Sequence, residues 1–417
     1  MNAAPKRKVV LVLGSGFSTS LTSGDRSLIG NRAMPTLGGL AEAMLAHLDG
    51  LGVGIGQLPF PTYIIEEVRG LLERNQKLSE KERFDFEQLL SLVAIKSAFA
   101  PASDSLRSNA DRMKHVLQCL IYLIPSLFAE HLAMDGKLVK NRNLFYAVKD
   151  ASRVRAIQGE IRHLVDTHDV TIISFNYDGL IEAFLDCDLG EAGEGTPPAF
   201  RYFPEVSHGF KMMMPEHVFG RPDMRDLSKY RNIPRVLKPH GSMHFYCIRE
   251  EIRNLTGAPQ LVALHPRFDL SFDAATMARD IPDIDFWRYA DPIPFIVPPV
   301  LNKEAFLSLD YLRVILGQAQ QALAGADAIV GLGFSIPRSD LHVNALFEYA
   351  AEERRSPPRV GLLYRQGPSD ETLANWTRVF GKAAVHEIER EGIPTQTAES
   401  IAATWNSVIR FIAESPS

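Results

Sequence analysis

Six short runs of apolar and β-branched residues recur along the chain, each bounded by glycine, proline or a polar turn. They are Val9–Leu13, Val170–Ser174, Arg235–Lys238, Phe295–Val297, Ala328–Leu332 and Arg359–Tyr364. Segments with helical periodicity separate several of them. Strands that are apolar throughout and alternate with helices are typical of a parallel sheet covered on both faces. The sequence therefore predicts an α/β fold, a Rossmann-like doubly wound parallel sheet.

A long helical segment separates the first two predicted strands. Apolar residues recur there at helical spacing in four stretches, Ile64–Leu72, Phe86–Ile95, Met113–Leu132 and Leu144–Val165. At roughly 150 residues the segment is too long for an ordinary crossover. We predict a helical insertion over residues 39–165, within one domain of residues 1–417. Further on, the glycines and prolines of Gly190–Pro234 predict a long irregular excursion, which contains Met212-Met213-Met214.

Charge and cysteine content argue against two classes of function. The chain has 45 basic and 50 acidic residues and a net charge of -5. Because no basic stripe is indicated, we expect no direct binding of nucleic acid. The cysteines Cys119, Cys187 and Cys247 are too far apart for a Cys-x-x-Cys zinc site or a disulfide framework. We therefore expect no bound metal.

Two apolar stretches bear on localisation. Val9–Leu13 ends at once in Gly14 and is too short for the apolar part of a secretory signal. Val116–Ala129, the longest apolar stretch, contains Gln118 and Pro125 and has the length of a buried helix. We expect a cytoplasmic protein that does not span a membrane.

A glycine-rich turn, Gly14-Ser15-Gly16-Phe17-Ser18, directly follows the first predicted strand. In nucleotide-binding α/β folds this turn presents backbone N–H groups to phosphate, and glycine lets the backbone approach the ligand. Thr19 replaces the third glycine of the dehydrogenase fingerprint, and no acidic residue follows in a recognisable second strand. This disfavours an ordinary NAD dehydrogenase. Alone, the motif fits a tight strand-to-helix turn equally well.

Polar residues follow the second, third and fifth predicted strands. Asn176 and Asp178 come after the second, His240 after the third, and Gly333-Phe334-Ser335 after the fifth, with Asp340 a few residues on. The carboxyl ends of parallel strands open onto the ligand crevice, so these residues are expected beside the first loop. A histidine there is placed to act as a general base. The simpler alternatives are that the Asn and Asp residues cap helices and that His240 is structural.

These four loops, in this order, resemble the motifs of the sirtuin-like family. The family's Gly-Ala-Gly-x-Ser loop is similar to Gly14–Ser18, and its Gln-Asn-x-Asp segment to Phe175–Asp178. Its catalytic His-Gly is similar to His240-Gly241, and its late Gly-x-Ser segment to Gly333–Ser335. The resemblance spans residues 9 to 364 and implies a single sirtuin-like domain.

Departures from the family pattern indicate a branch of it. Deacylating sirtuins carry a zinc module with four cysteines, which three scattered cysteines cannot build, and Phe175 replaces their glutamine. Of their Gly-Ile-Pro-Asp-Phe-Arg loop, Met34-Pro35 is the nearest trace. Lys238–Ser242, and Phe84–Glu87 within the helical segment, look instead like the prokaryotic sirtuin-like NAD hydrolases of antiphage defence.

The resemblance implies an NAD+ hydrolase that cleaves the nicotinamide glycosidic bond and releases nicotinamide and ADP-ribose, with NAD as substrate. Asn176 would orient the ribose and the attacking water, His240 would act as general base, and Asp178 would lie near the nicotinamide carboxamide. Gly14–Ser18 would receive the diphosphate. The adenosine half would contact Gly333, Phe334, Ser335 and Asp340.

Members of this branch destroy cellular NAD in abortive infection, so their activity needs control. The resemblance implies a homo-oligomer and, in some members, a separate DNA-translocase ATPase or an Argonaute-like partner. Two other functions fit the same motifs. One is a sirtuin-type protein deacylase or ADP-ribosyltransferase, and the other is a module that binds NAD or ADP-ribose to regulate a partner.

Overall fold

A computed structural model describes residues 6–22, 27–30, 32–51, 60–79, 82–98, 104–132, 145–185, 201–202, 234–247, 261–263, 267–269, 293–297, 310–338, 340–364, 367–388 and 398–414. Of the predicted excursion Gly190–Pro234, the description covers residues 201–202 and 234, and Met212–Met214 lie outside it.

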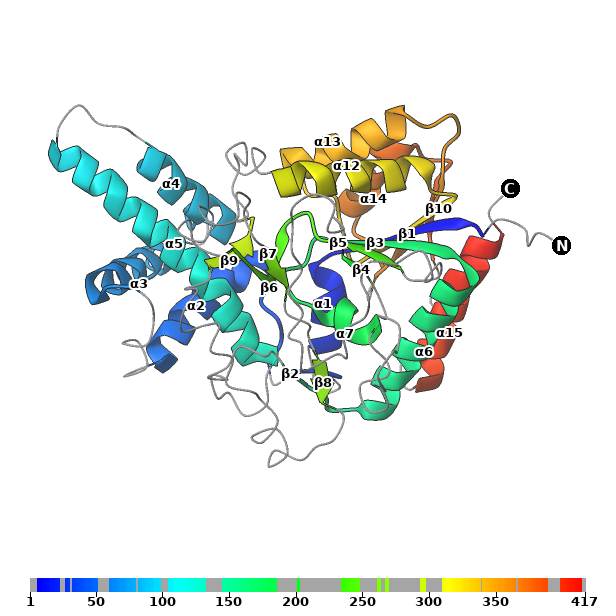
Figure 1. The fold of residues 1–417 in the computed structure, drawn as a ribbon, viewed down its shortest axis with the longest axis horizontal. Helices are drawn as coiled ribbons and strands as arrows, with labels where there is room; N and C mark the ends of the chain where they lie inside the picture. The colour runs from blue at the N-terminus through cyan, green and yellow to red at the C-terminus, as the bar shows by residue number, and fades with distance from the viewer. Residues whose placement is uncertain are drawn as a thin grey trace.

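The centre of the molecule is a parallel sheet with, in the described residues, seven strands in the order β12-β11-β10-β1-β3-β5-β4 (Figure 1). The strands are β1 (Lys8–Leu13), β3 (Asp169–Ser174), β4 (Arg201–Tyr202), β5 (Arg235–Leu237), β10 (Ala328–Leu332), β11 (Arg359–Leu363) and β12 (Val385–Glu387). All their pairings are parallel. Five of the six residues of β1 and of β3 are buried, as expected of strands covered on both faces. The predicted α/β, Rossmann-like fold is confirmed.

Helices cover both faces of this sheet (Figure 1). One layer contains α12 (Asp310–Gly325), α13 (Leu341–Glu352) and α14 (Asp370–Phe380), and the other contains α1 (Ser15–Thr22), α6 (Ala151–Thr167), α7 (Leu180–Leu185) and α15 (Ala398–Ala413). Strand β1 lies between β3 and β10, so the chain runs outward from it in both directions. The carboxyl end of β1 is therefore the switch point at which such sheets bind ligands.

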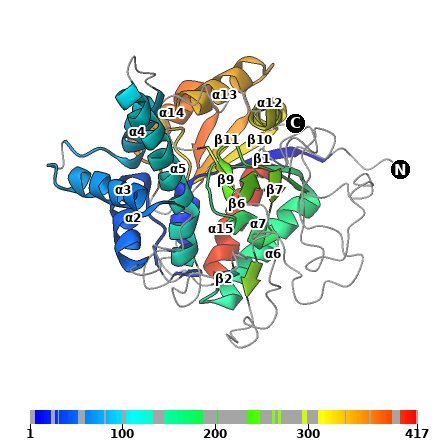
Figure 2. The ribbon, with the colours of Figure 1, turned by 60° about the vertical axis from the view of Figure 1, so that its left-hand side comes forward.

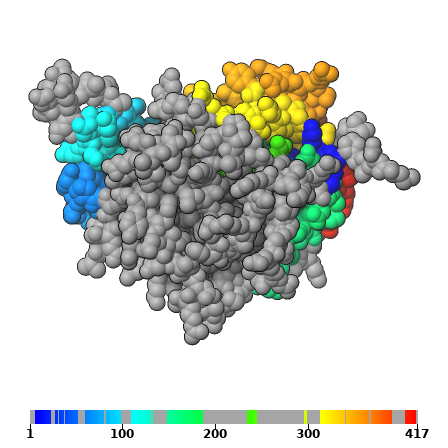
Figure 3. Space-filling model, in the orientation of Figure 1, coloured from blue at the N-terminus to red at the C-terminus, as the bar shows by residue number. Residues whose placement is uncertain are grey.

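The helical insertion forms one end of the molecule (Figures 2 and 3). It consists of α2 (Leu37–Leu51), α3 (Thr62–Gln76), α4 (Phe86–Ala98) and α5 (Asp104–Leu132), which pack on one another. Each presents an apolar face to the others; on α3 this face is Ile64, Ile65, Val68 and Leu72.

The helical insertion was predicted to span residues 39–165 and so to include α6. The packing of α6 places this helix outside the insertion. This helix contacts β3, α7 and α15, so it belongs to the layer that covers the sheet. The stretch Leu144–Val165 was predicted to be helical throughout, but residues Phe145–Ala147 form strand β2 before α6 begins.

Two small sheets connect the insertion to the parallel sheet. Strand β6 (Gly241–Cys247) pairs antiparallel with β7 (Leu261–Ala263) and β9 (Ile293–Ile296), and β2 pairs with β8 (Arg267–Asp269). The predicted strand Phe295–Val297 therefore lies in the antiparallel sheet and not in the central one. Helix α5 contacts β9, which brings the insertion close to the end of β5.

Helix α5 is also, by length and composition alone, apolar enough over Asn109–Leu132 to cross a membrane. In this structure 59% of the tested window is buried, where it packs on α3 and α4. Helices of this kind also occur in the cores of soluble proteins.

Candidate functional site

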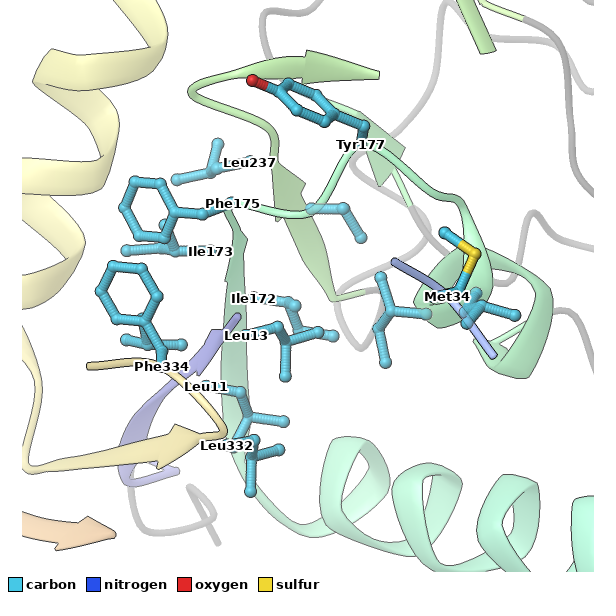
Figure 4. Close-up of a cluster of buried hydrophobic side chains, with 14 of the residues drawn as sticks. Leu11, Leu13, Met34, Ile172, Ile173, Phe175, Tyr177, Leu237, Leu332 and Phe334 are labelled. Carbon is cyan, nitrogen blue, oxygen red and sulfur yellow. The ribbon is translucent and has the colours of Figure 1, made fainter. Parts of the chain in front are cut away.

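The loops predicted to form a site all lie at one edge of the sheet. Leu13 at the end of β1 pairs with Ser174 of β3 on one side and with Leu332 of β10 on the other. Ile173 pairs in turn with Leu237 of β5. The residues that follow these strands therefore emerge at the same level. The apolar side chains of these strand ends form the cluster shown in Figure 4.

The loops after β1 and β10 are bonded to each other through their backbones. The N–H groups of Gly14 and Gly16 donate to the carbonyls of Leu332 (3.2 Å) and Gly333 (3.1 Å). A Cβ on Gly14 would lie 2.4 Å from the Gly333 oxygen, and one on Gly333, whose φ is +61°, would lie 2.5 Å from the nitrogen of Phe17. The three glycines are therefore required by contact between two segments of the chain.

This contact bears on the predicted binding of diphosphate by Gly14–Ser18. The N–H of Phe17 donates to the Gly14 carbonyl (2.9 Å), so three of the loop's N–H groups bond within the protein. Of the other residues of this loop, Ser15 is exposed at the first position of α1, and Ser18 is buried. The geometry favours the tight-turn interpretation for the glycines and leaves Ser15 as the residue that can face an anion.

Asn176 is buried beside this loop and is held in one orientation. Its side-chain nitrogen Nδ2 donates to the Gly14 carbonyl (2.8 Å) and to Ser18 Oγ (3.0 Å). A carbonyl oxygen can only accept, so the amide hydrogens must face Gly14. The oxygen Oδ1 is therefore the atom of Asn176 that can accept a hydrogen bond from a ligand.

Asp178 holds Ser18, and through it Asn176, in position. Ser18 Oγ donates to Asp178 Oδ2 (2.6 Å), and the N–H of Leu180 donates to Oδ1 (3.1 Å). The second bond is the helix-capping role named as the simpler alternative, here at the start of α7. Both oxygens thus have partners in the protein, and Asp178 acts on Asn176 through Ser18.

A buried ion pair fixes the other side of the Asp178 backbone. Lys238 Nζ donates to the Asp178 carbonyl (2.6 Å) and lies 3.3 Å from Glu182 Oε1, and both charged side chains are fully buried. Sequence reasoning did not find this pair as part of the site. The only signal was a lysine closing an apolar strand immediately before Pro239 and His240.

His240 lies at the turn between β5 and β6. Its Nε2 is 3.0 Å from Asp340 Oδ2, and the two side chains are 16% and 5% exposed. Gly241 makes this turn possible, because its φ is +73° and a Cβ would lie 2.2 Å from the Phe295 carbonyl. Asp340, which was predicted to contact the adenosine half of NAD, lies against the imidazole.

Aromatic rings form the wall beside His240. The rings of Phe175 and Phe334 stack with centroids 4.4 Å apart and planes 10° from parallel (Figure 4). Phe175 also meets the imidazole of His240 edge-on at 5.2 Å. Such rings exclude water and leave an electrostatic interaction near the imidazole weakly screened.

The segment after Gly333 is anchored from α14. Trp376 Nε1 donates to the Phe334 carbonyl (2.8 Å), and Asn375 Nδ2 donates to the Ser335 carbonyl (3.3 Å). Ile336 has a φ of +49°, which a β-branched residue adopts only under strain. The partly buried Ser335, predicted to contact the adenosine half, is thus held by its backbone at the site's edge.

The helical insertion meets the site at Tyr177, a residue of the loop after β3. The phenol donates to the Val297 carbonyl (2.9 Å), and its ring lies 6.4 Å from that of Phe128 on α5. Burial raises the pKa of Tyr177 well above its ordinary value, and the charges of Asp340 and Glu87 raise it further. Tyr177 therefore remains a hydrogen-bond donor. Glu87, buried near the start of α4, was not recognised as a site residue from the sequence.

Within the residues that the structure describes, no three His, Cys, Asp or Glu side chains are grouped so as to hold a metal ion. Cys119 is buried in α5, and desolvation raises the pKa of its thiol to about 12. Compared with known proteins, the sequence matches no family model, and no curated protein matches it either.

Proposed function

We propose that the protein is an NAD+ glycohydrolase of sirtuin-like type, which cleaves NAD to nicotinamide and ADP-ribose. One observation carries the proposal. Asn176 and His240 stand at the carboxyl edge of one parallel sheet, at its switch point, with the glycine loop of β1 between them and β10. The four motifs and their order in the sequence resemble those of NAD-cleaving proteins, and on that basis we assign NAD, and not another nucleotide, to this edge of the sheet.

The reaction needs a water molecule, a base and a held ribose. Water attacks C1′ of the nicotinamide ribose, the C–N bond breaks with its electron pair going to nicotinamide, and a base takes a proton from the water. Asn176 Oδ1 accepts a hydrogen bond from a ribose hydroxyl or from the water, and the imidazole of His240 takes the proton. The Phe175 and Phe334 rings keep bulk water from the developing charge.

Two of the roles implied by the resemblance are revised in this proposal. Asp178 holds Ser18 and, through it, Asn176, because both carboxylate oxygens already accept hydrogen bonds within the protein. The diphosphate is assigned to exposed Ser15 at the start of α1, where the helix dipole favours an anion. Gly333, Phe334 and Ser335 keep their place beside the adenosine half.

The biological setting proposed is depletion of cellular NAD in antiphage defence, in the cytoplasm and without direct contact with nucleic acid. Unregulated cleavage would kill the host, so we propose control by homo-oligomerisation or by a separate partner chain. A DNA-translocase ATPase and an Argonaute-like protein are the two kinds of partner that the resemblance suggests.

The test is nicotinamide release from NAD by the purified protein over a range of protein concentrations. Asn176→Ala and His240→Ala are each expected to lower turnover by roughly 100-fold or more, because they remove the orienting group and the base. Asn75→Ala is the matched control. Asn75, on α3, is also a buried asparagine, and its side chain forms hydrogen bonds with the backbone of Phe84. A steep rise of specific activity with concentration supports control by assembly.

Other outcomes of this experiment support the competing functions. NAD binding without nicotinamide release, at every concentration, leaves two alternatives, an enzyme that needs its partner chain or a module that binds NAD or ADP-ribose. Turnover of acyl-lysine peptides favours a deacylase, and transfer of ADP-ribose to protein favours a transferase. Full activity in Asn176→Ala or His240→Ala would contradict the assignment of the site.

A further inference from the structure

Asp340 reaches His240 from a different part of the chain. It precedes α13 and stands on the β10 side of the sheet, whereas His240 follows β5, yet Oδ2 and Nε2 are 3.0 Å apart. Both side chains are largely shielded from water, and an interaction between them is weakly screened. A partner at this distance decides which nitrogen of the imidazole carries the proton.

The chemistry of the pair fixes that choice. A carboxylate can only accept a hydrogen bond, so the imidazole must donate to it from Nε2. In the neutral ring the other nitrogen, Nδ1, then has a lone pair and no proton. Nδ1 is therefore the atom of His240 that can take a proton from a substrate hydroxyl or a water molecule.

The carboxylate of Asp340 is itself held in place. Its second oxygen, Oδ1, accepts from the N–H of Val343 (3.2 Å) and caps α13. The amino end of a helix carries partial positive charge, which favours an ionised carboxylate at this position. Asp340 thus has one oxygen on the helix and one on the imidazole, and its orientation is fixed by both.

We propose that Asp340 is a positioning residue, which holds His240 in the Nε2–H tautomer and so makes Nδ1 the base. The proposal rests on the function proposed above. When Nδ1 takes a proton from the attacking water, His240 becomes an imidazolium with both nitrogens protonated, and the adjacent carboxylate stabilises that charge. The electron pair of the broken bond leaves with nicotinamide, and the proton later passes to solvent.

The variant that isolates this role is Asp340→Asn. Asparagine caps helices as well as aspartate does, so the start of α13 is preserved while the negative charge is lost. The neutral amide can also donate to Nε2, which permits the other tautomer. We expect kcat to fall by roughly 100-fold with little change in KM, because the base is presented wrongly while the substrate still binds. The matched control is Asp150→Asn, the same substitution at the N-cap of α6, with expected activity close to wild type.

A measurement independent of NAD cleavage is the tautomer of His240. In protein labelled with 15N-histidine, the 15N shifts of the two ring nitrogens distinguish the protonated from the unprotonated one. The signal is assigned by its loss in His240→Gln. We expect the Nε2–H form in the neutral ring of the wild type, and loss of that preference in Asp340→Asn only.

The two measurements separate failure of this proposal from failure of the proposed function. An Nδ1–H tautomer in the wild type, or a tautomer unchanged in Asp340→Asn, overturns the role of Asp340. Full activity in Asp340→Asn, in an enzyme that does hydrolyse NAD, overturns it as well. If the wild type binds NAD but does not cleave it at any protein concentration, the proposed function loses its support, while the tautomer still decides whether Asp340 sets the state of His240.

Discussion

The two pairs of loops that form the site are held together by different means. On the β1–β10 side, Gly14, Gly16 and Gly333 let two backbones touch and bond directly. On the β3–β5 side, Lys238 joins the two loops by donating to the Asp178 carbonyl, and Asn176 and Asp178 bond Ser18 of α1 through buried polar side chains. The first side depends on the absence of side chains and the second on their charges. The same edge of the sheet is therefore sensitive to opposite kinds of substitution.

The largest expected effect is on the charged side, from Lys238→Met. Glu182 would lose the positive charge of Lys238 while its carboxylate stays fully buried, which costs about 3–5 kcal/mol of unfolding free energy. Urea denaturation followed by circular dichroism measures the loss. The double variant Lys238→Met with Glu182→Leu is the control, because replacing both charges with apolar groups is expected to restore most of the stability. Equal losses in the single and the double variant would contradict the buried-charge explanation.

A smaller loss is expected on the glycine side, from Gly333→Ala. The positive φ and the contact of the new Cβ with the nitrogen of Phe17 together cost about 2–4 kcal/mol. The control is Gly317→Ala in α12, where a Cβ meets nothing within 4 Å in the part of the chain that the structure describes. There we expect a gain of about 0.5–1 kcal/mol. Thermal or urea unfolding of both variants tests the difference, and similar effects at the two glycines would refute it.

The smallest effect is expected at Asp150, where the polar side chains are reached by solvent. It serves as a comparison for the buried polar side chains of the site. Asp150 caps α6, and the Ser152 hydroxyl and the Arg153 N–H lower its pKa to about 2. Asp150→Ala should cost about 1 kcal/mol at neutral pH. The folded pKa is depressed, so the contribution of the charge is present above the unfolded value of about 4 and is lost as the pH falls towards 2. Urea unfolding at neutral pH and at pH of about 3 should show the difference between variant and wild type shrinking. A difference independent of pH would mean that the carboxylate charge is not the cause.

Strands β1, β3, β5, β10 and β11 of the parallel sheet could be predicted because each carries its own signal, whereas β4 lies in the predicted excursion Gly190–Pro234. Runs such as Val9–Leu13 and Ala328–Leu332 are apolar on both faces and end in glycine, and a local pattern of that kind is enough to find a buried strand. The loops that follow these strands then place Asn176 and His240 at the same edge of the parallel sheet. The strand near Phe295 was assigned to the wrong sheet, because its partner β6 is set by tertiary contacts that no local pattern records.

The partners inside the site were not predictable for a similar reason. Asp340 reads locally as a helix cap, which it is, and nothing near it in the sequence points to His240. The pairing of Lys238 with Glu182 likewise joins two segments that meet only in the folded chain. Gly14 and Gly16 matched a phosphate-binding pattern, whereas their close contact with Gly333 supplies a sufficient reason for them.

Val297 connects the helical insertion to His240. Its N–H donates to the carbonyl of His240, and its carbonyl accepts from the Tyr177 phenol, whose ring meets Phe128 of α5. One peptide segment after β9 thus couples the tilt of a long helix to the position of the imidazole. If the proposed function holds, a ligand that displaces α5 would act on His240 along this route, at a distance from the glycine loop.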